Sequence, residues 1–330
     1  MTTLIDELMR AKSAADPFGR PAAKEIEEYE RAKAALNEEA KANWDNETWH
    51  REMAAVLAQR FDYGFQFDNL FGTYFEVRQV GEFDQLTITE RRGMNVFWTA
   101  RGGYIEETQL KTERFTLPRD TIGFHVSEFA DKLRANYAET IEALVNLATQ
   151  RLDAEVNRRM LNLLQAAIPS TSAYYVNATT GLTKTILDTA LREVQDNVQP
   201  NNGVTAPVTI LGRAAMIDQI SDVVTDAAAL FDPEATAEIR RRGRLGVYRG
   251  ANIVRINNYT DENDNSYIPA NELWVFGGTV GTFVKYGGMQ TKSWEENTVD
   301  YRHYRGRMDC GGLIYRPEQA RRIVDGTVTP

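Results

Sequence analysis

Cysteine and histidine are scarce in this chain of 330 residues. Cys310 is the only cysteine, so neither an internal disulfide nor a thiolate metal cluster can form. The three histidines, His50, His125 and His303, lack the spacing of a paired metal site. We therefore expect no metal ion and no cofactor, and we interpret Cys310 as a small buried apolar residue. His125 lies in a predicted strand, where we expect a partly buried structural role.

Basic residues are also fewer than acidic residues. The chain has 38 Lys and Arg against 47 Asp and Glu, which gives a formal net charge of -9. Proteins that grip nucleic acid need clustered Lys and Arg for phosphate contacts, so this balance argues against such a task. A protein that only encloses nucleic acid has no such need, and an acidic wall would keep the polymer from adhering.

Long apolar runs are absent as well. No stretch approaches the roughly 18–20 apolar residues that a membrane-spanning helix needs. Asp6, Glu7, Arg10 and Lys12 fall within one short amphipathic run, which is unlike a secretion signal. With 42% hydrophobic and 26% charged residues, the composition is that of a soluble chain that buries a core. We expect it to be made and folded in a cytoplasm, without a membrane partner.

Signatures of catalysis are lacking too. No serine lies in a Gly-x-Ser-x-Gly elbow, and no Gly-x-x-x-x-Gly-Lys-Ser/Thr phosphate loop is present. Residues 277–281 are rich in glycine but lack the lysine of a phosphate loop. A turn between strands explains these glycines. Carboxylate pairs such as Glu106-Glu107 and Glu295-Glu296 are ordinary on an acidic surface. The sequence thus predicts no catalytic residue.

The first 60 residues predict helices with little core of their own. A predicted helix over residues 24–43 is rich in Ala, Glu and Lys, with Ile26, Tyr29 and Leu36 as sparse apolar positions. Such a stripe buries too little to hold a helix in place, so we expect this arm to be solvated or docked on a partner. A neighbouring subunit is a reasonable candidate.

From Phe83 to Val126 the apolar period changes to two, which predicts a long β-hairpin. Leu86 and Ile88 mark the outgoing strand, residues 91–93 are a predicted turn, and the strand pattern continues across Pro118. Two strands cannot cover their own apolar face, so the hairpin needs a surface to lie on.

A long helix is the strongest local signal. Asn136 and Glu139 make a predicted capping pair. Apolar residues then recur at three- and four-residue steps from Ile141 to Leu164, without Gly or Pro before Pro169. At about 1.5 Å per residue this helix spans on the order of 45 Å, a length suited to a structural spine.

The remainder alternates between helix and strand. The predicted helices cover residues 183–198 and 214–224. The predicted strands cover residues 207–211, 246–248, 253–256, 273–276, 282–286 and 307–315. The last of these strands is free to return to the long helix. We predict an α+β protein of two interleaved domains.

One pattern is a candidate for calcium binding. Asp261, Asn263, Asn265 and Glu272 occupy positions one, three, five and twelve of a calcium-loop frame. Ser266 replaces the glycine that the sharp turn needs, and strands flank the segment. A solvated loop between strands is therefore the favoured interpretation.

Two basic runs, residues 240–244 and 302–307, are candidates for contact with nucleic acid. The alternative is that they form salt bridges or a solvated face. The net charge of -9 favours the alternative.

The order of these parts resembles that of tailed-bacteriophage major capsid proteins, whose fold is named after the Hong Kong ninety-seven phage. The clearest local likeness lies in the C-terminal third. It comprises Leu245-Gly246-Val247-Tyr248-Arg249-Gly250-Ala251-Asn252-Ile253-Val254, Glu272-Leu273-Trp274-Val275-Phe276-Gly277, Phe283-Val284-Lys285-Tyr286-Gly287-Gly288 and Gly311-Gly312-Leu313-Ile314-Tyr315-Arg316-Pro317-Glu318.

The resemblance implies a particular division of the chain. It comprises an N-terminal helical arm (1–77), an extended β-hairpin loop (78–125), a peripheral domain with the spine helix (126–170 and 300–330) and an axial α/β domain (171–299). On this pattern the loop would lie over a neighbour, and the axial domain would meet its copies at five-fold and six-fold positions. The short arm leads us to expect no cleavage, and no partner residue predicts a crosslink through Lys111.

The resemblance also implies a function. The subunit would assemble through pentamers and hexamers into an icosahedral shell around the double-stranded DNA of a tailed phage. It would be made and assembled in the bacterial cytoplasm and would reside in the virion capsid. Its partners would be its own copies, scaffolding and portal proteins and a decoration protein, with DNA enclosed without sequence-specific binding. The candidate contacts between subunits are Arg91, Arg92, Trp98, Arg101, Asp261 and Asp264.

Two other functions stay open. An encapsulin-type shell that houses a cargo enzyme has the same fold but should lack so long a helical arm. A soluble α/β enzyme with an unrecognised site would need a pocket with convergent polar groups. We rank the capsid protein first and the enzyme last.

Overall fold

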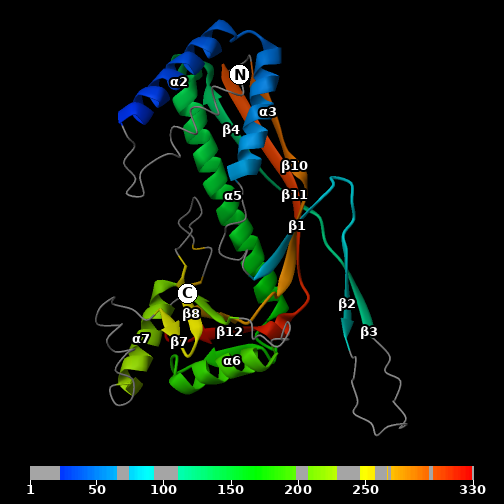
Figure 1. Cartoon of the computed structure of the whole chain (residues 1–330), viewed down its shortest axis with the longest axis vertical. Helices are drawn as coiled ribbons and strands as arrows, with labels where there is room; N and C mark the ends of the chain where they lie inside the picture. Colours follow the sequence, from blue (N-terminus) through cyan, green and yellow to red (C-terminus); the bar gives the residue numbers. More distant parts are fainter. Residues whose placement is uncertain are drawn as a thin grey trace. The chain divides into compact units, whose positions relative to one another are not determined.

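The computed structural model describes residues 23–64, 74–92, 111–197, 207–228, 246–256, 266, 269–296 and 300–328 (Figure 1). The chain divides into two compact units. The first unit comprises Met1–Asn69, Thr121–Val156 and Gly287–Asp309, and the second comprises Leu70–Asp120, Asn157–Tyr286 and Cys310–Pro330. This mixture of helices and sheets confirms the predicted α+β class.

Helices supply most of the core of the first unit. They are α2 (Ala23–Ala42), α3 (Glu47–Gly64), α4 (Ala130–Ala135) and the first part of α5 (Tyr137–Ala167). The large buried side chains include Trp49, Met53, Leu133, Tyr137, Leu152, Tyr304 and Met308. The last two come from a strand, so helices and sheet share one core.

The prediction that the helical arm lacks a core of its own was wrong. Helix α2 has nearly the predicted bounds, and its Ala32, Leu36 and Ala40 are only 4%, 1% and 1% exposed. These residues recur every four positions, so they form one stripe that packs within the first unit, where α2 contacts α4. Two of the three are alanines, which a search for large apolar residues passes over.

The predicted long helix is confirmed as α5, of 31 residues. Asn136 and Glu139 are hydrogen-bonded, but the side-chain amide of Asn136 donates to the Glu139 carboxylate and the N–H of Asn136 donates to the carbonyl of Lys132, whereas in the predicted capping pair each side chain would accept from the other residue's backbone N–H. The backbone N–H of Ala138 in the first turn, however, donates to the side-chain oxygen of Asn37 in α2, at 2.9 Å. The arm thus satisfies a donor that the helix leaves without an intrahelical partner.

A four-stranded sheet has the order β1-β10-β11-β4. Its strands are β1 (Phe75–Val80), β10 (Gly281–Glu296), β11 (Tyr301–Ile314) and β4 (Asp120–Phe129), with β1 parallel to β10. Strands β10 and β11 are far longer than predicted, and they and α5 contribute residues to both units. Burial alternates along β11, where Arg302, Tyr304, Gly306, Met308 and Cys310 are buried. Cys310 is therefore buried, as predicted.

The second unit is built on a six-stranded mixed sheet of order β5-β12-β9-β6-β8-β7. The strands are β5 (Tyr175–Ala178), β12 (Ala320–Asp325), β9 (Glu272–Phe276), β6 (Thr209–Gly212), β8 (Ala251–Arg255) and β7 (Val247–Tyr248). The 3₁₀ turn η1 (Pro317–Gln319) precedes β12. Strand β12 pairs parallel with β5 and antiparallel with β9, and β6 pairs parallel with β8.

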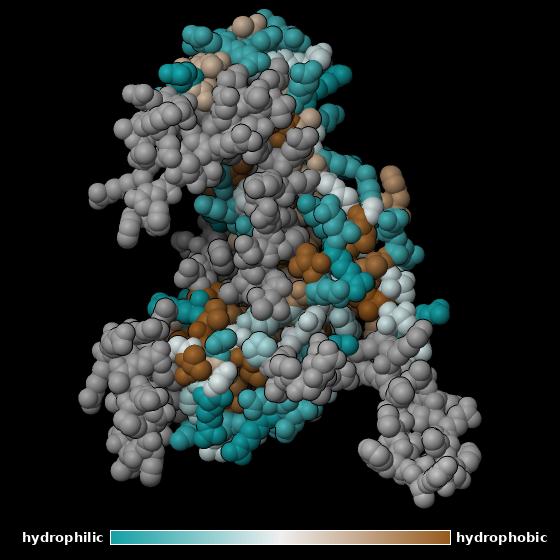
Figure 2. Space-filling view, viewed as in Figure 1, coloured by the Kyte–Doolittle hydropathy of each residue, from teal (hydrophilic) through white to brown (hydrophobic). Residues whose placement is uncertain are grey.

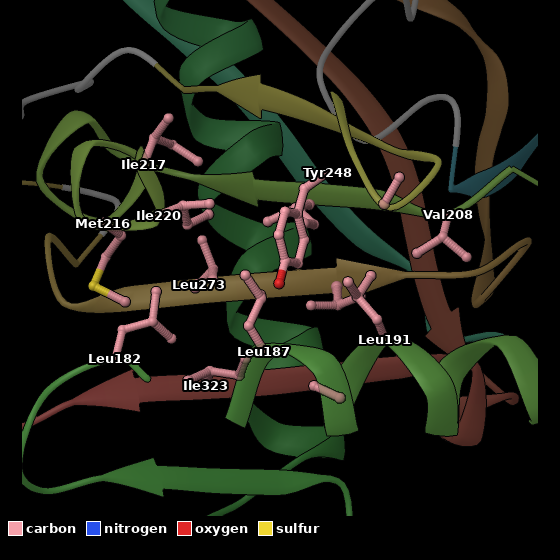
Figure 3. Packing of buried hydrophobic residues seen from close by; sticks show 14 of the residues in the cluster. Leu182, Leu187, Leu191, Val208, Met216, Ile217, Ile220, Tyr248, Leu273 and Ile323 are labelled. Carbon is pink, nitrogen blue, oxygen red and sulfur yellow. The ribbon is translucent and has the colours of Figure 1, made fainter. Parts of the chain in front are cut away.

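Helices α6 (Lys184–Asn197) and α7 (Ala214–Ala228) pack on this sheet through an apolar cluster (Figure 3). Leu187 and Leu191 of α6 and Ile220 of α7 belong to the cluster, and each is at most 2% exposed. Leu273 of β9 faces the same cluster, whereas the ring of Phe276 stacks on Tyr74 at 4.5 Å. Both faces of β9 are therefore buried, which agrees with its continuous apolar sequence.

Candidate assembly surfaces

The hairpin is a two-stranded sheet formed by β2 (Thr87–Arg92) and β3 (Lys111–Thr116). Arg91 lies opposite Thr112 and Arg92 opposite Lys111. The prediction of a turn at residues 91–93 was therefore wrong for these two arginines, because the antiparallel ladder continues through them. Trp98 and Arg101, the other candidate contacts of the hairpin, lie outside the described residues.

The base of the hairpin is anchored on the second unit. Leu117, Val284 and Tyr286 form a small buried cluster there. Val80, Leu86, Ile88 and Leu313 pack against this cluster and are partly buried. The guanidinium of Arg119 lies 5.1 Å from the centre of the Tyr286 ring, a cation–π contact. The chain thus supplies a support for the base that the two strands alone would lack.

The turn at Gly81–Gln85, which joins β1 to β2, presents an exposed aromatic ring. The N–H of Asp84 donates to the carbonyl of Gly81 at 3.2 Å, and the N–H of Gly81 donates to the Asp84 carboxylate at 3.0 Å. Phe83 is 90% exposed on this turn, and Val77 of β1 is 39% exposed. Apolar surface is also visible over β1 and β10, whereas the outer side of α6 is hydrophilic (Figure 2). This ring is a candidate contact for another chain, because its own turn leaves it almost fully in solvent.

In the first unit, the sheet face opposite the helices carries a cluster of rings. His125 of β4 lies 3.2 Å from His303 of β11, measured between Nε2 and Nδ1. The other nitrogen of His303 lies 3.0 Å from the Glu296 carboxylate, and the indole of Trp294 stacks on His303 at 5.1 Å. His125 is exposed, so the prediction of partial burial was wrong, since alternate residues of edge strand β4 face solvent. Sequence reasoning missed the cluster because 178 positions separate the two histidines.

Three cations occupy the same face. Arg307 donates through Nε and Nη2 to the side-chain oxygen of Gln290, at 3.0 and 2.9 Å. Lys292 and Arg305 are exposed on the neighbouring positions of β10 and β11. In the described ranges, no carboxylate forms an ion pair with any of the three. We refer to Lys292, Arg305 and Arg307 as the cationic face.

The two predicted basic runs have different outcomes. Arg302 is only 4% exposed, and it donates to Glu295 at 3.0 Å while lying 5.4 Å from the centre of the Trp44 ring. This arginine is therefore an internal salt-bridge partner, in agreement with the favoured alternative. Residues 240–244 lie outside the described residues.

Glu272, the twelfth position of the calcium-loop frame, is committed to an internal polar cluster. It is 3% exposed and accepts hydrogen bonds from Gln165 at 3.0 Å and from the indole of Trp274 at 3.2 Å. Arg322 of β12 forms an ion pair with the same carboxylate. The prediction of a solvated loop was thus wrong for Glu272, which starts a buried strand.

The remaining acidic candidates of this segment, Asp261 and Asp264, lie outside the described residues, as do Asn263 and Asn265. Ser266 is described, and its hydroxyl accepts a hydrogen bond from Arg213 at 3.0 Å. Among the residues that the structure describes, no group of three His, Cys, Asp or Glu could hold a metal ion.

Two groups in the first unit have shifted pKa values. Burial lowers the pKa of His50 to about 4, although the hydrogen bond between its ring and the carbonyl of Trp44, at 2.7 Å, acts in the opposite direction. Burial raises the pKa of Asp153 on α5 to about 6. Both shifts mark groups that the core tolerates best in the neutral form.

A comparison with protein families identifies the class of this chain. Residues 54–318 match the family described as "YonB: SPbeta prophage-derived putative capsid protein YonB". The match covers most of the sequence, and the chain belongs to this family of prophage-derived capsid proteins. A search of curated protein sequences found no match.

Solved structures with a similar fold come from the capsids of phages and of a GTA particle. The capsid structure of cyanophage P-SCSP1u matches with a TM-score of 0.57 at 14% identity, over 78% of this chain and 88% of that one. The asymmetric unit of the bacteriophage PhiM1 mature capsid gives 0.53 at 11% identity, over 80% and 89%. The capsid of an empty GTA particle gives 0.51 at 11% identity, over 77% and 89%. The predicted phage capsid fold is therefore confirmed.

Family and fold agree on a capsid protein, a structural component of the virion shell. The helices in the described part of the chain include none that is long and apolar enough to cross a membrane.

Proposed function

We propose that this capsid protein assembles through pentamers and hexamers into an icosahedral shell around the double-stranded DNA of a tailed phage. The observation that carries the proposal is the family match over residues 54–318. A closed shell requires each subunit to offer different surfaces that repeat around rings, which are heterologous contacts in the terms of symmetric assembly.

The described surfaces fit such a subunit. The hairpin β2–β3 has its base anchored on the second unit and lacks a third strand among the described residues. Phe83 adds an exposed ring, and Lys292 and Arg305 of the cationic face add exposed charges that form no ion pair with the described residues. We assign the hairpin to a contact over a neighbour, with Arg91, Arg92, Trp98 and Arg101 as its candidate residues. Asp261 and Asp264 remain candidates for a contact near a symmetry axis.

The proposal includes the division into arm (1–77), loop (78–125), peripheral domain (126–170 and 300–330) and axial domain (171–299). The proposed partners are scaffolding and portal proteins and a decoration protein. The proposed place of assembly is the bacterial cytoplasm. The subunit would enclose DNA without reading its sequence and would catalyse no reaction. The net charge of -9 supports an enclosing rather than a gripping role.

Negative-stain electron microscopy tests the proposal. The chain is expressed alone and together with its neighbouring genes, and sedimentation velocity measures the assembled fraction. We expect hollow particles of uniform diameter in at least one condition. Small discrete oligomers in both conditions would contradict the proposal, and electron-dense protein cargo inside the particles would favour an encapsulin-type shell instead.

A further inference from the structure

The cationic face places like charges next to one another. The hydrogen bond between Gln290 and Arg307 and the stack of Trp294 on His303 fix the pairing of β10 with β11. Residues on one face of a strand recur every second position, so Lys292 and Arg305 fall between these two contacts as neighbours across the strands. Like charges opposite one another destabilise a sheet. Among the described residues, Glu296 and Asp309 lie on the same face, but no carboxylate forms an ion pair with Lys292 or Arg305. An anionic group from outside the unit would remove this repulsion.

Aromatic rings continue the same face. The rings of Phe129 and Tyr301 lie 4.2 Å apart, and Phe129 is 52% exposed. Trp294 and His303 form the second ring pair of the face. The face therefore offers cations and exposed ring surface together, and a ligand with both negative charge and an aromatic group would match it.

The turn Gly81–Gln85 has the complementary chemistry. Its Glu82, Phe83 and Asp84 are all exposed, and Phe83 is the most exposed large apolar side chain described, at 90%. Asp84 also closes the turn through the N–H of Gly81, which holds the segment in one conformation before any partner binds. A pre-formed turn loses little conformational entropy on docking.

From this complementarity, and resting on the proposed shell function, we infer that the turn Gly81–Gln85 of one subunit docks on the cationic face of a neighbouring copy. Glu82 approaches Lys292 and Arg305, and the ring of Phe83 packs beside the exposed aromatic rings. Packaged DNA is the other anionic occupant to consider. DNA phosphates would pair with the cations but would leave the ring of Phe83 in solvent. Docking of the turn would pair the cations with Glu82 and would also bury the ring, so we favour the turn as the occupant.

Site-directed crosslinking tests whether the two segments meet between copies. A tagged Gln85→Cys chain and an untagged Ser127→Cys chain are co-assembled and treated with a short bis-maleimide. Both positions are exposed, one on the turn and the other on β4 on the same face as His125, and neither removes a group that the docking uses. Cys310, the one native cysteine, is buried, and wild-type particles control for its reaction. A crosslinked dimer that contains both chains is expected in particles. Particles that form normally but yield no mixed dimer would overturn the inference, whereas failure of wild-type particles would count against the proposed function instead.

Charge reversal provides the second test. Lys292→Glu with Arg305→Glu should lower the assembled fraction about tenfold or more, because the turn then meets like charge. Glu82→Arg in that background should restore much of the loss. Arg31→Glu with Lys41→Glu, at exposed positions of α2, makes the same change in net charge and should assemble normally. Thermal unfolding of each unassembled subunit checks its fold.

The results of these experiments distinguish the turn of a neighbouring copy from DNA as the group bound to the cationic face. Loss in both double variants, or no restoration by Glu82→Arg, would overturn the docking. Normal particles that package less DNA after reversal of Lys292 and Arg305 would assign the cationic face to DNA and would also overturn it. Loss confined to the cationic face, with restoration by Glu82→Arg, would support docking of the turn.

Discussion

Replacing Glu272 by glutamine removes a buried negative charge and nearly preserves the shape of the side chain. The carboxylate is 3% exposed and interacts with Arg322, Gln165 and Trp274. All three partners are donors, and a glutamine offers them only one oxygen while it turns its own N–H donors toward donors. Arg322, whose side chain is 17% exposed, would keep its charge without a carboxylate partner.

The size of the effect follows from the burial of the pair. Removing one partner of a buried ion pair typically costs about 3–5 kcal/mol of unfolding free energy. Arg322 retains a hydrogen bond to the carbonyl of Ile168, at 3.3 Å, and lies 5.6 and 5.7 Å from the ring centres of Tyr175 and Trp274. These contacts place Glu272→Gln near the lower limit, at about 3 kcal/mol.

A double-mutant cycle measures this coupling. Arg322→Met should cost a similar amount near neutral pH, because it leaves the carboxylate buried and unpaired. Glu272→Leu combined with Arg322→Met removes both charges and should cost much less than the sum of the single changes. The assay is urea-induced unfolding of the purified subunit, in conditions where sedimentation shows no particles. Single variants within about 1 kcal/mol of wild type, or additive effects, would refute the reasoning.

Four further predictions concern the core and the pH dependence of its stability. Leu36→Ala should lower the unfolding free energy by about 3 kcal/mol, measured by urea titration, because the arm is part of the core; a loss below about 1 kcal/mol would contradict this. Gly311→Ala should cost about 3 kcal/mol in the same assay, because its Cβ would lie 2.0 Å from the carbonyl oxygen of Pro118, and wild-type stability would show that the contact is wrong. His50 binds its proton less tightly in the folded state than in the unfolded chain, so its contribution is complete above pH 6.5 and is lost as the pH falls toward 4, by about 3 kcal/mol. The raised pKa of Asp153 has the opposite sign: its contribution is complete below pH 3.8 and is lost as the pH rises through about 6. Thermal unfolding from pH 4 to 7 measures both effects. The rise of stability with pH should be smaller in His50→Gln, and the fall of stability with pH should be smaller in Asp153→Asn. Profiles of stability against pH that match the wild type would refute both assignments.

The sequence alone determined the elements whose signals are local. The three- and four-residue spacing from Ile141 to Leu164 is sufficient for α5, because contacts along a helix join residues close in sequence. The order of elements, with the glycine-punctuated strands of the C-terminal third, was sufficient to predict the capsid fold that the family and structural matches confirm. Strands with continuous apolar sequence, such as β9, were also predicted nearly to their ends.

Only the tertiary structure showed which charged and small residues are buried. Strand β12 was missed because Arg321, Arg322 and Asp325 resemble surface residues, yet Arg321 is 4% exposed and Asp325 is fully buried. Hydrogen bonds to Asp325 from Thr327 and Leu182 outweigh the effect of burial and lower its pKa, and Leu182 is 143 positions away. Distant partners also account for the burial of the alanines of α2 and for the contact of His125 with His303. The period of a segment reports which of its residues share a face, but the partner that makes burial of a charge favourable becomes known only when distant segments pack together.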